Sequence, residues 1–128
     1  MSNAAILDAS ALLALLGDEP GGEVVAPLLD GATISTVNWS EVLARYVDVG
    51  LETEGREAEI ESLGVSLALF TSRQADIAAG LLPFTRKAGL SLGDRACLAL
   101  ALDLGGRPVT ADRAWGRIDV GLDVTLIR

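Results

Sequence analysis

Residues 4–10 read AAILDAS, an apolar run that ends in an aspartate and then turns polar. Four consecutive apolar residues are typical of a strand buried on both faces of a parallel sheet. A helical pattern follows as far as Leu16 and stops at Gly17, which completes a strand–helix unit. Asp8 therefore stands at the carboxyl end of the first expected strand, where parallel sheets bind their ligands.

Strand and helix patterns alternate through the rest of the chain. Further strands are expected at residues 32–35, 65–70, 108–110 and 124–127. Helices are expected at residues 23–29, 36–49, 53–62, 71–87 and 92–104, with a kink or break at Pro83. This alternation favours parallel pairing through right-handed crossovers. We expect a single domain over residues 1–128, of the α/β class: a three-layer α/β/α sandwich around a central, mostly parallel sheet of about five strands.

Composition restricts the chemistry. The chain has no histidine and one cysteine, Cys97, so neither an intramolecular disulfide nor a Cys/His zinc site can form. Any metal would be held by oxygen, which favours Mg²⁺ or Mn²⁺. The formal charge of −8 argues against nonspecific coating of nucleic acid, although carboxylates at a metal site would contribute to that charge. Nine of the ten basic residues are arginines, which suit bidentate contacts with phosphate.

The apolar runs are much shorter than the roughly 20 residues that cross a bilayer. The N-terminus also lacks the basic region of a signal peptide. We expect a cytoplasmic protein with no membrane association.

Three further carboxylates are expected near Asp8. Glu41 and Asp94 lie where apolar helices begin, and Asp112 follows the strand at residues 108–110. Carboxylates that converge repel one another and lose solvation, so such a group needs a cation, bound protons or a basic partner. A divalent metal is the first hypothesis.

Each of these acids also has a structural explanation. Asp8 and Asp94 could each cap free amides at the start of a helix. Glu41 could form an ion pair with Arg45 one turn later, and periodicity does not bury it. An Asx turn would account for Asp112. The four acids therefore indicate a metal site only when they are taken together, because each one alone has a structural explanation.

Polar residues near the acids could support them. Ser10 and Thr110 each lie two residues from one acid, and their hydroxyls could orient a carboxylate or a metal-bound water. Helix capping is nevertheless the first expectation for Ser10, and Thr36 or Asn38 is expected to cap the helix at residues 36–49.

The acids stand in four short segments: DASAL at residues 8–12, SEV at 40–42, GLSLGDRA at 89–96 and TAD at 110–112. In this order they resemble the motifs of PIN-domain ribonucleases, most closely the VapC-type toxins of type II toxin–antitoxin pairs. Each motif is short, but the ordered combination spans nearly the whole chain. The resemblance implies a PIN-like fold and a Mg²⁺-dependent endoribonuclease, with Mn²⁺ as a substitute, that hydrolyses RNA phosphodiester bonds as a toxin.

The resemblance also implies roles for the acids. The catalytic acids would be Asp8, Glu41, Asp94 and Asp112. All but Glu41 would bind metal directly, Glu41 would act through water, and Thr110 would be an accessory polar residue. Family members often carry further acidic or polar residues after the last motif, where this chain has RAW at residues 113–115. Asp119 is a weak candidate for an additional ligand.

The partners implied are a cognate VapB-like antitoxin, an RNA substrate and a second copy of the chain in a homodimer. Apolar residues 12–16, with Val42 and Tyr46, could receive an antitoxin helix or that second copy, although core packing is expected for most of them. Trp39 and Trp115 could stack on RNA bases, but packing against the sheet is expected for both.

Two other functional classes remain open. A catalytically degenerate PIN-like module would keep the acids for structure and serve only in binding. An aspartate-based, Mg²⁺-dependent phosphatase or phospho-receiver would also place an acid at a strand end. The phosphatase requires Asp-x-Asp, whereas Asp8 is followed by Ala9 and Ser10. The receiver requires a lysine at a late strand end, whereas the only lysine, Lys87, falls in an expected helix.

Overall fold

The central element of the computed structural model, which describes residues 4–128, is a five-stranded parallel sheet. Its strands are β1 (Ala5–Leu7), β2 (Thr33–Ser35), β3 (Ser66–Ala68), β4 (Arg107–Thr110) and β5 (Thr125–Leu126). They are ordered β3-β2-β1-β4-β5 and all neighbours pair in parallel. The chain builds the sheet outward from β1 to β3 and then returns to the other side of β1. The strand order therefore switches between β1 and β4, the position at which such sheets bind ligands.

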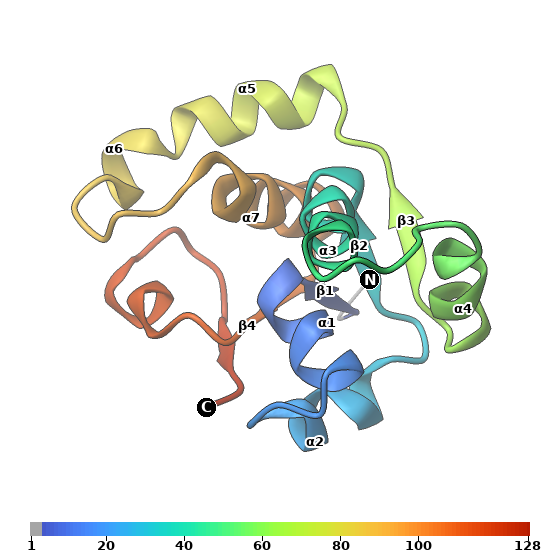
Figure 1. Cartoon of the computed structure of the whole chain (residues 1–128). Helices are drawn as coiled ribbons and strands as arrows, with labels where there is room; N and C mark the ends of the chain where they lie inside the picture. Colours follow the sequence, from blue (N-terminus) through green and yellow to red (C-terminus); the bar gives the residue numbers. More distant parts are fainter. Residues whose placement is uncertain (1–3) are drawn as a thin grey trace.

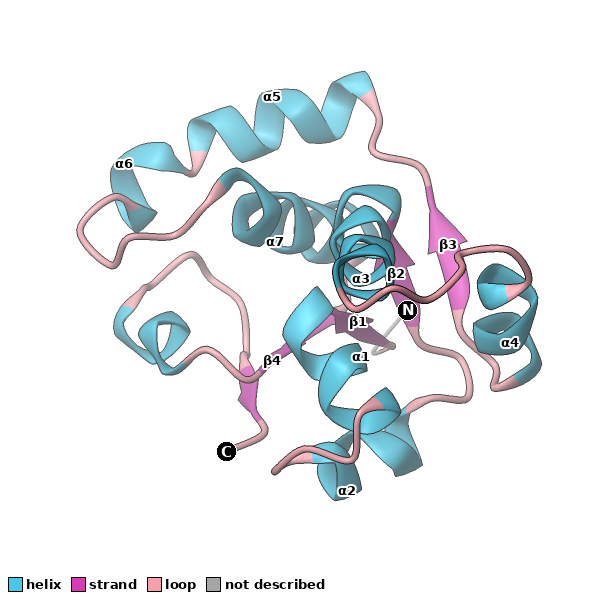
Figure 2. Cartoon of the chain, viewed as in Figure 1, coloured by secondary structure: helices cyan, strands magenta, loops and turns pink. Residues whose placement is uncertain are grey.

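Helices cover both faces of this sheet. They are α1 (Ala9–Leu16), α2 (Gly22–Val25), α3 (Thr36–Asp48), α4 (Arg56–Ser62), α5 (Ser72–Gly80), α6 (Leu82–Thr85) and α7 (Leu92–Leu104), with short 3₁₀ helices η1 (Ala26–Leu28) and η2 (Arg113–Arg117). Figure 1 shows α5 and α7 on one side of β1, and α1 and α2 on the other. The expected three-layer α/β/α sandwich with a parallel sheet is confirmed. In Figure 2, helices (cyan) and strands (magenta) alternate along the chain. Residues 1–3 of the expected domain lie outside the described part.

The residues of β1 divide the core in two, because successive side chains of a strand point to opposite faces. Ala5 and Leu7 pack with α1, α2 and α3, whereas Ile6 packs with α7. Trp39 belongs to the first cluster and Trp115 to the second, with 6% and 1% of their surfaces exposed. Both tryptophans are core residues, as expected.

The elements differ from expectation mainly at their ends. The break near Pro83 is confirmed, since α5 ends at Gly80 and α6 begins at Leu82. The expected helix at residues 23–29 is divided into α2 and η1, because Pro27 has no amide to continue the α-helical hydrogen bonding. Within residues 4–128, every helix is too short or too polar to cross a membrane.

The start of α3 changes the place of two polar residues. Ser35 caps this helix, its hydroxyl accepting a hydrogen bond from Val37 N at 3.2 Å, so the expected cap at Thr36 or Asn38 is wrong. Ser35 has the extended backbone that a cap requires, whereas the other two are already helical. Asn38 therefore lies inside the first turn, and Glu41, expected near the beginning of this helix, lies in its second turn.

Candidate active site

Asp8 directly follows β1 and is almost fully buried, with 4% of its surface exposed. Its Oδ1 accepts hydrogen bonds from Ser10 Oγ at 2.7 Å and Ala11 N at 2.8 Å, and its Oδ2 accepts one from Thr110 Oγ1 at 2.5 Å. Asp8, and not Ser10, therefore caps α1, because it has the extended backbone immediately before the helix. Ser10 and Thr110 instead orient its carboxylate, the alternative role considered for both hydroxyls.

The same two hydroxyls connect β1 to the end of β4. Leu7 pairs with Val109 in the sheet, so Asp8 lies beside Thr110. Ser10 Oγ accepts a hydrogen bond from Ala111 N at 2.9 Å, and Thr110 Oγ1 accepts one from Asp112 N at 3.0 Å.

Asp112 itself is exposed and caps η2, with its Oδ1 accepting from Ala114 N at 2.9 Å. The local turn considered as a structural explanation for Asp112 is therefore present. The hydrogen bond to Thr110 nevertheless connects its backbone to the residue that holds Asp8.

Asp94 lies in the first turn of α7 and forms a reciprocal capping box with Ser91. Asp94 Oδ2 accepts from Ser91 N at 2.8 Å, while Ser91 Oγ accepts from Asp94 N at 3.2 Å. Its structural explanation is thus confirmed. The capping box uses one carboxylate oxygen, and Asp94 Oδ1 has no hydrogen-bond partner among residues 4–128.

Glu41 on α3 is connected to α7 through Asn38. The Nδ2 group of Asn38 donates to Glu41 Oε1 and to Gly93 O, both at 2.9 Å. The Glu41–Arg45 ion pair considered as a structural explanation is not formed, because Arg45 Nη1 lies 3.6 Å from a carboxylate oxygen of Glu19.

The contacts of Asn38 with Glu41 and Gly93 were not predicted from the sequence, in which Asn38 was expected to cap a helix. The available signal was a polar residue three positions before Glu41, the spacing that places two side chains on one helical face. That the same amide also reaches Gly93 on another helix could not be read from this spacing.

The pKa values indicate that the four acids share one electrostatic neighbourhood. Burial raises the pKa of Asp8 to about 6, and the negative charge of Asp94 adds to this increase, while hydrogen bonds such as that from Thr110 oppose it. Burial also raises the pKa of Asp94, with a further contribution from the charge of Asp112. The pKa of the buried Cys97 thiol is raised by burial and then by the charges of Asp8, Asp94 and Glu41.

A model of the PIN domain family matches residues 5–121 of the chain. The chain belongs to the PIN domain family. Three solved structures have the same fold at low sequence identity, whereas a search of curated proteins gave no match. A chain of a toxin–antitoxin complex from Klebsiella pneumoniae gives a TM-score of 0.74 at 18% identity over 98% of both chains.

The other two are VapBC complexes. The DNA-bound complex from Salmonella typhimurium gives a TM-score of 0.71 at 16% identity, over 99% of this chain and 100% of that chain. VapBC-1 from nontypeable Haemophilus influenzae gives a TM-score of 0.69 at 20% identity, over 97% of this chain and 98% of that chain. The PIN fold therefore extends over nearly the whole length of all three.

The donor set of this PIN domain suits a hard divalent cation, because it consists of carboxylates whose mutual repulsion a cation would offset. As the side chains stand, residues 4–128 contain no group of three or more histidine, cysteine, aspartate or glutamate residues arranged to hold an ion. Asp8 is held by three donors and Asp94 is turned toward Ser91 N. The acids thus share a neighbourhood without meeting at one ligand position.

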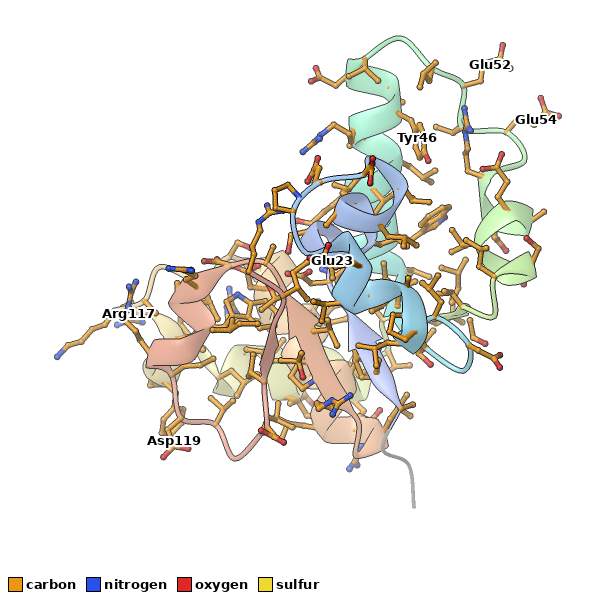
Figure 3. All side chains as sticks on the ribbon, turned by 90° about the horizontal axis from the view of Figure 1, so that it is seen from below. Glu23, Tyr46, Glu52, Glu54, Arg117 and Asp119 are labelled. Atoms are coloured by element: carbon orange, nitrogen blue, oxygen red, sulfur yellow. The ribbon has the colours of Figure 1, made fainter. Side chains whose placement is uncertain are left out.

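Asp119 lies apart from this PIN-domain site. Its Oδ1 accepts from Gly121 N at 3.4 Å in an exposed loop, and it lines a hollow of about 300 Å³ with Leu81, Phe84 and Val120. The charge of Asp119 is not among those that shift the pKa of Asp8 or Asp94. Figure 3 shows Asp119 at the same end of the molecule as Arg117, away from Tyr46.

Proposed function

We propose that this PIN domain is a Mg²⁺-dependent endoribonuclease, with Mn²⁺ as a substitute, that hydrolyses RNA phosphodiester bonds as the VapC-type toxin of a toxin–antitoxin pair. The PIN family is a family of nucleases, which supports hydrolysis of nucleic acid. The observation that carries the proposal is that hydrogen bonds connect the segments of the four acids: Thr110 contacts both Asp8 and Asp112 N, and Asn38 connects Glu41 to the turn of α7 that carries Asp94. The chain has no histidine to serve as an alternative acid or base.

Asp8, Asp94 and Asp112 would hold the ion, with Glu41 contacting it through water. When bound, such an ion lowers the pKa of water and offsets the negative charge that develops on the phosphodiester. Ser10 and Thr110 keep the Asp8 carboxylate in a fixed orientation. This leaves Glu41 as the exposed carboxylate that can accept a proton from the attacking water.

A cleavage assay with single-stranded RNA tests this function. The wild-type protein should cleave with Mg²⁺ or Mn²⁺ and lose activity in EDTA. Asp94→Asn should lower kcat by about 100-fold or more, since even residues that only support metal ligands contribute about 10- to 100-fold. Its melting temperature should change little, because the amide oxygen can still accept from Ser91 N. Cleavage that survives EDTA, or full activity of Asp94→Asn, would contradict the proposal.

The same preparation distinguishes the alternative functions. A catalytically degenerate PIN domain would cleave no RNA under any metal condition. An aspartate-based phosphatase would instead release phosphate from a small phosphate ester, and a phospho-receiver would become labelled by a phosphoryl donor. Neither of the last two activities is expected. The phosphatase requires Asp-x-Asp, whereas Ala9 and Ser10 follow Asp8, and the receiver requires a lysine at a late strand end, which this chain lacks.

We further propose that the antitoxin docks in an apolar groove between α1 and α3. The groove has a volume of about 250 Å³ and is lined by Leu13, Leu16, Gly17, Glu19, Arg45, Tyr46, Val49 and Leu51. Val49 and Leu51 are 60% and 50% exposed, whereas Leu12 and Val42 are buried in the core, as expected for most of this segment. Figure 3 shows the acidic Glu52 and Glu54 at the same end of the molecule as Tyr46. A segment with apolar anchors and basic side chains would suit this surface.

The remaining partners are also proposals. A PIN toxin with an RNA substrate and a VapB-like antitoxin would meet both in the cytoplasm. We propose a homodimer, because a small domain with one acidic site gains RNA-binding surface by pairing. Light scattering of the purified protein would give twice the mass of the chain if this is correct, and the mass of one chain if it is wrong.

A further inference from the structure

Asn38 is a buried polar residue that connects two helices. Only 1% of its surface is exposed, and its Nδ2 group on α3 donates both to Glu41 Oε1 and to the Gly93 carbonyl of α7. Its Oδ1 atom is buried without a hydrogen-bond partner among residues 4–128. An unpaired buried acceptor is unfavourable for folding, so the contribution of Asn38 to stability alone does not explain this residue.

Asn38 provides the hydrogen bond that holds Glu41. No other hydrogen bond or ion pair involves the Glu41 carboxylate within residues 4–128, and Arg45 is directed to Glu19 instead. An exposed glutamate without such a partner samples several rotamers, and fixing it in one is entropically unfavourable. The hydrogen bond from the Asn38 amide offsets this entropy loss, so the Glu41 side chain is already ordered before substrate binds.

Gly93 provides the space for the Glu41 carboxylate. A Cβ atom at Gly93 would lie 2.5 Å from Glu41 Oε2 and 2.8 Å from Glu41 Cδ, closer than real Cβ contacts. Glycine inside a helix is less stable than alanine by about 1 kcal/mol, so its presence in the first turn of α7 needs a local reason. The carboxylate of Glu41 therefore packs against the turn of α7 that carries Asp94.

We propose that Asn38 is a positioning residue, which with Gly93 holds the Glu41 carboxylate against α7 beside Asp94 in the arrangement that hydrolysis requires. This inference rests on the proposed nuclease function. Asn38 does not touch the reacting atoms, and it acts through Glu41. Any loss of activity on changing Asn38 must therefore require that Glu41 is present.

A double-mutant cycle tests this dependence. Asn38→Leu replaces both polar atoms of the amide by carbon, so its melting temperature should be unchanged or higher, because the unpaired Oδ1 is removed. Its kcat should nevertheless fall by about 10- to 100-fold, the usual effect of losing a residue that orients a metal-site carboxylate. In a Glu41→Gln background, the same change should lower kcat no further.

Two further variants protect the test against misfolding. Asn38→Ala removes the Nδ2 donor without adding charge or bulk, and should show the same dependence on Glu41. Gly93→Ala should also lower kcat, because its Cβ displaces the Glu41 carboxylate. The matched control is Gly80→Ala at the end of α5, where a Cβ meets nothing within 4 Å, and it should retain full activity.

Equal effects of Asn38→Leu with and without Glu41, or full activity of both Asn38 variants, would overturn the inference. Metal affinity gives an independent readout, since Mn²⁺ binding measured by electron paramagnetic resonance should weaken in Asn38→Leu but not in Gly80→Ala. If the wild-type protein neither cleaves RNA nor binds Mn²⁺, the proposed function is wrong. The positioning role is then decided by crystal structures of the wild type and Asn38→Leu: displacement of the Glu41 side chain supports it, and an unmoved side chain refutes it.

Discussion

At the scale of single residues, Asp8 shows how the site conflicts with folding. Its pKa rises from 3.8 to about 6, chiefly because of burial, even though three donors hold the carboxylate. Between these two values, the folded protein binds more protons than the unfolded chain. The stability contributed by Asp8 therefore falls as pH rises from about 4 to 6, and it remains at its lower value above that range. At neutral pH the buried charge of Asp8 is unfavourable for folding, and a bound cation would offset it.

Asp8→Asn removes this electrostatic cost, so the metal-free variant should be more stable than the wild type at pH 7.5. A shift from 3.8 to about 6 corresponds to at most roughly 3 kcal/mol in the free energy of unfolding, or up to about 11 °C in Tm. The difference should shrink as the pH is lowered and vanish near pH 4. Thermal unfolding in EDTA across this pH range measures it.

The matched control is Asp119→Asn, which makes the same chemical change in an exposed loop and should leave the unfolding curve unchanged. An Asp8→Asn protein that is less stable than the wild type at pH 7.5 would show that the hydrogen bonds of the carboxylate outweigh its burial.

The sequence predicted Asp8 better than it predicted Asn38, for a physical reason. An acid that closes an apolar run needs a partner wherever the chain places it, so Asp8 could be recognised locally. Asn38 is significant only because α7 brings the Gly93 carbonyl to it, across 55 positions of sequence. A contact of that kind depends on tertiary packing and leaves no periodic pattern in one sequence.

At the scale of elements, α7 is a helix whose first and last residues were both predicted correctly from the sequence. The Ser91 hydroxyl and the Asp94 carboxylate close its first turn, and Gly105 ends it with a φ of 72°, which glycine adopts without strain. The prediction of residues 92–104 therefore matches the structure. By contrast, η2 could not be predicted, because it is a single 3₁₀ segment stabilised by Asp112 at its start.

Because Ser91 both caps α7 and holds Asp94, Ser91→Ala should affect stability and activity together. Loss of a helix cap lowers the free energy of unfolding by about 1 kcal/mol. RNA cleavage should also decrease, since the Ser91 hydroxyl no longer accepts from Asp94 N and the first turn of α7, which carries Asp94, frays. Denaturant unfolding and the cleavage assay measure the two effects on one preparation.

Thr71→Ala is the matched control, because the Thr71 hydroxyl caps α5 by accepting a hydrogen bond from the backbone N of Gln74. Helix α5 carries none of the four acids. It should have a similar loss of stability with no loss of cleavage. If both variants lose activity in proportion to stability, the capping box has no specific role in the site.

At the scale of the whole molecule, topology determines which distant residues meet. The switch in strand order between β1 and β4 brings Asp8 beside Thr110, and α7 then adds Asp94 to the same neighbourhood. The alternation of strands and helices made this arrangement predictable at the level of the sheet. The exact directions of the carboxylates could not be predicted, because they depend on capping hydrogen bonds.

The groove between α1 and α3 gives a prediction for the proposed antitoxin partner. Val49→Arg places a cation in the groove at an exposed position near the C-terminal end of α3, where a positive charge does not disturb the helix. Affinity for the proposed VapB-like antitoxin should fall by about 10-fold or more, as expected when charge is buried in an apolar contact. Isothermal titration calorimetry measures it.

The matched control is Leu69→Arg, which is 75% exposed and does not line the groove. It should leave affinity for the antitoxin unchanged, and both variants should cleave RNA as the wild type does. If Val49→Arg and Leu69→Arg lose affinity equally, or if neither loses affinity, the antitoxin binds elsewhere on the surface.

The proposed hydrolysis depends on a divalent metal bound by the carboxylates at the switch in strand order between β1 and β4. Anomalous diffraction from crystals soaked in Mn²⁺ tests it most directly, because it locates the ion without reference to activity. We expect a peak among the carboxylate oxygens of Asp8, Asp94 and Asp112, with the Asp94 side chain turned from Ser91 toward the ion. The absence of a peak at these residues, or a peak only on other carboxylates of the surface, would contradict it.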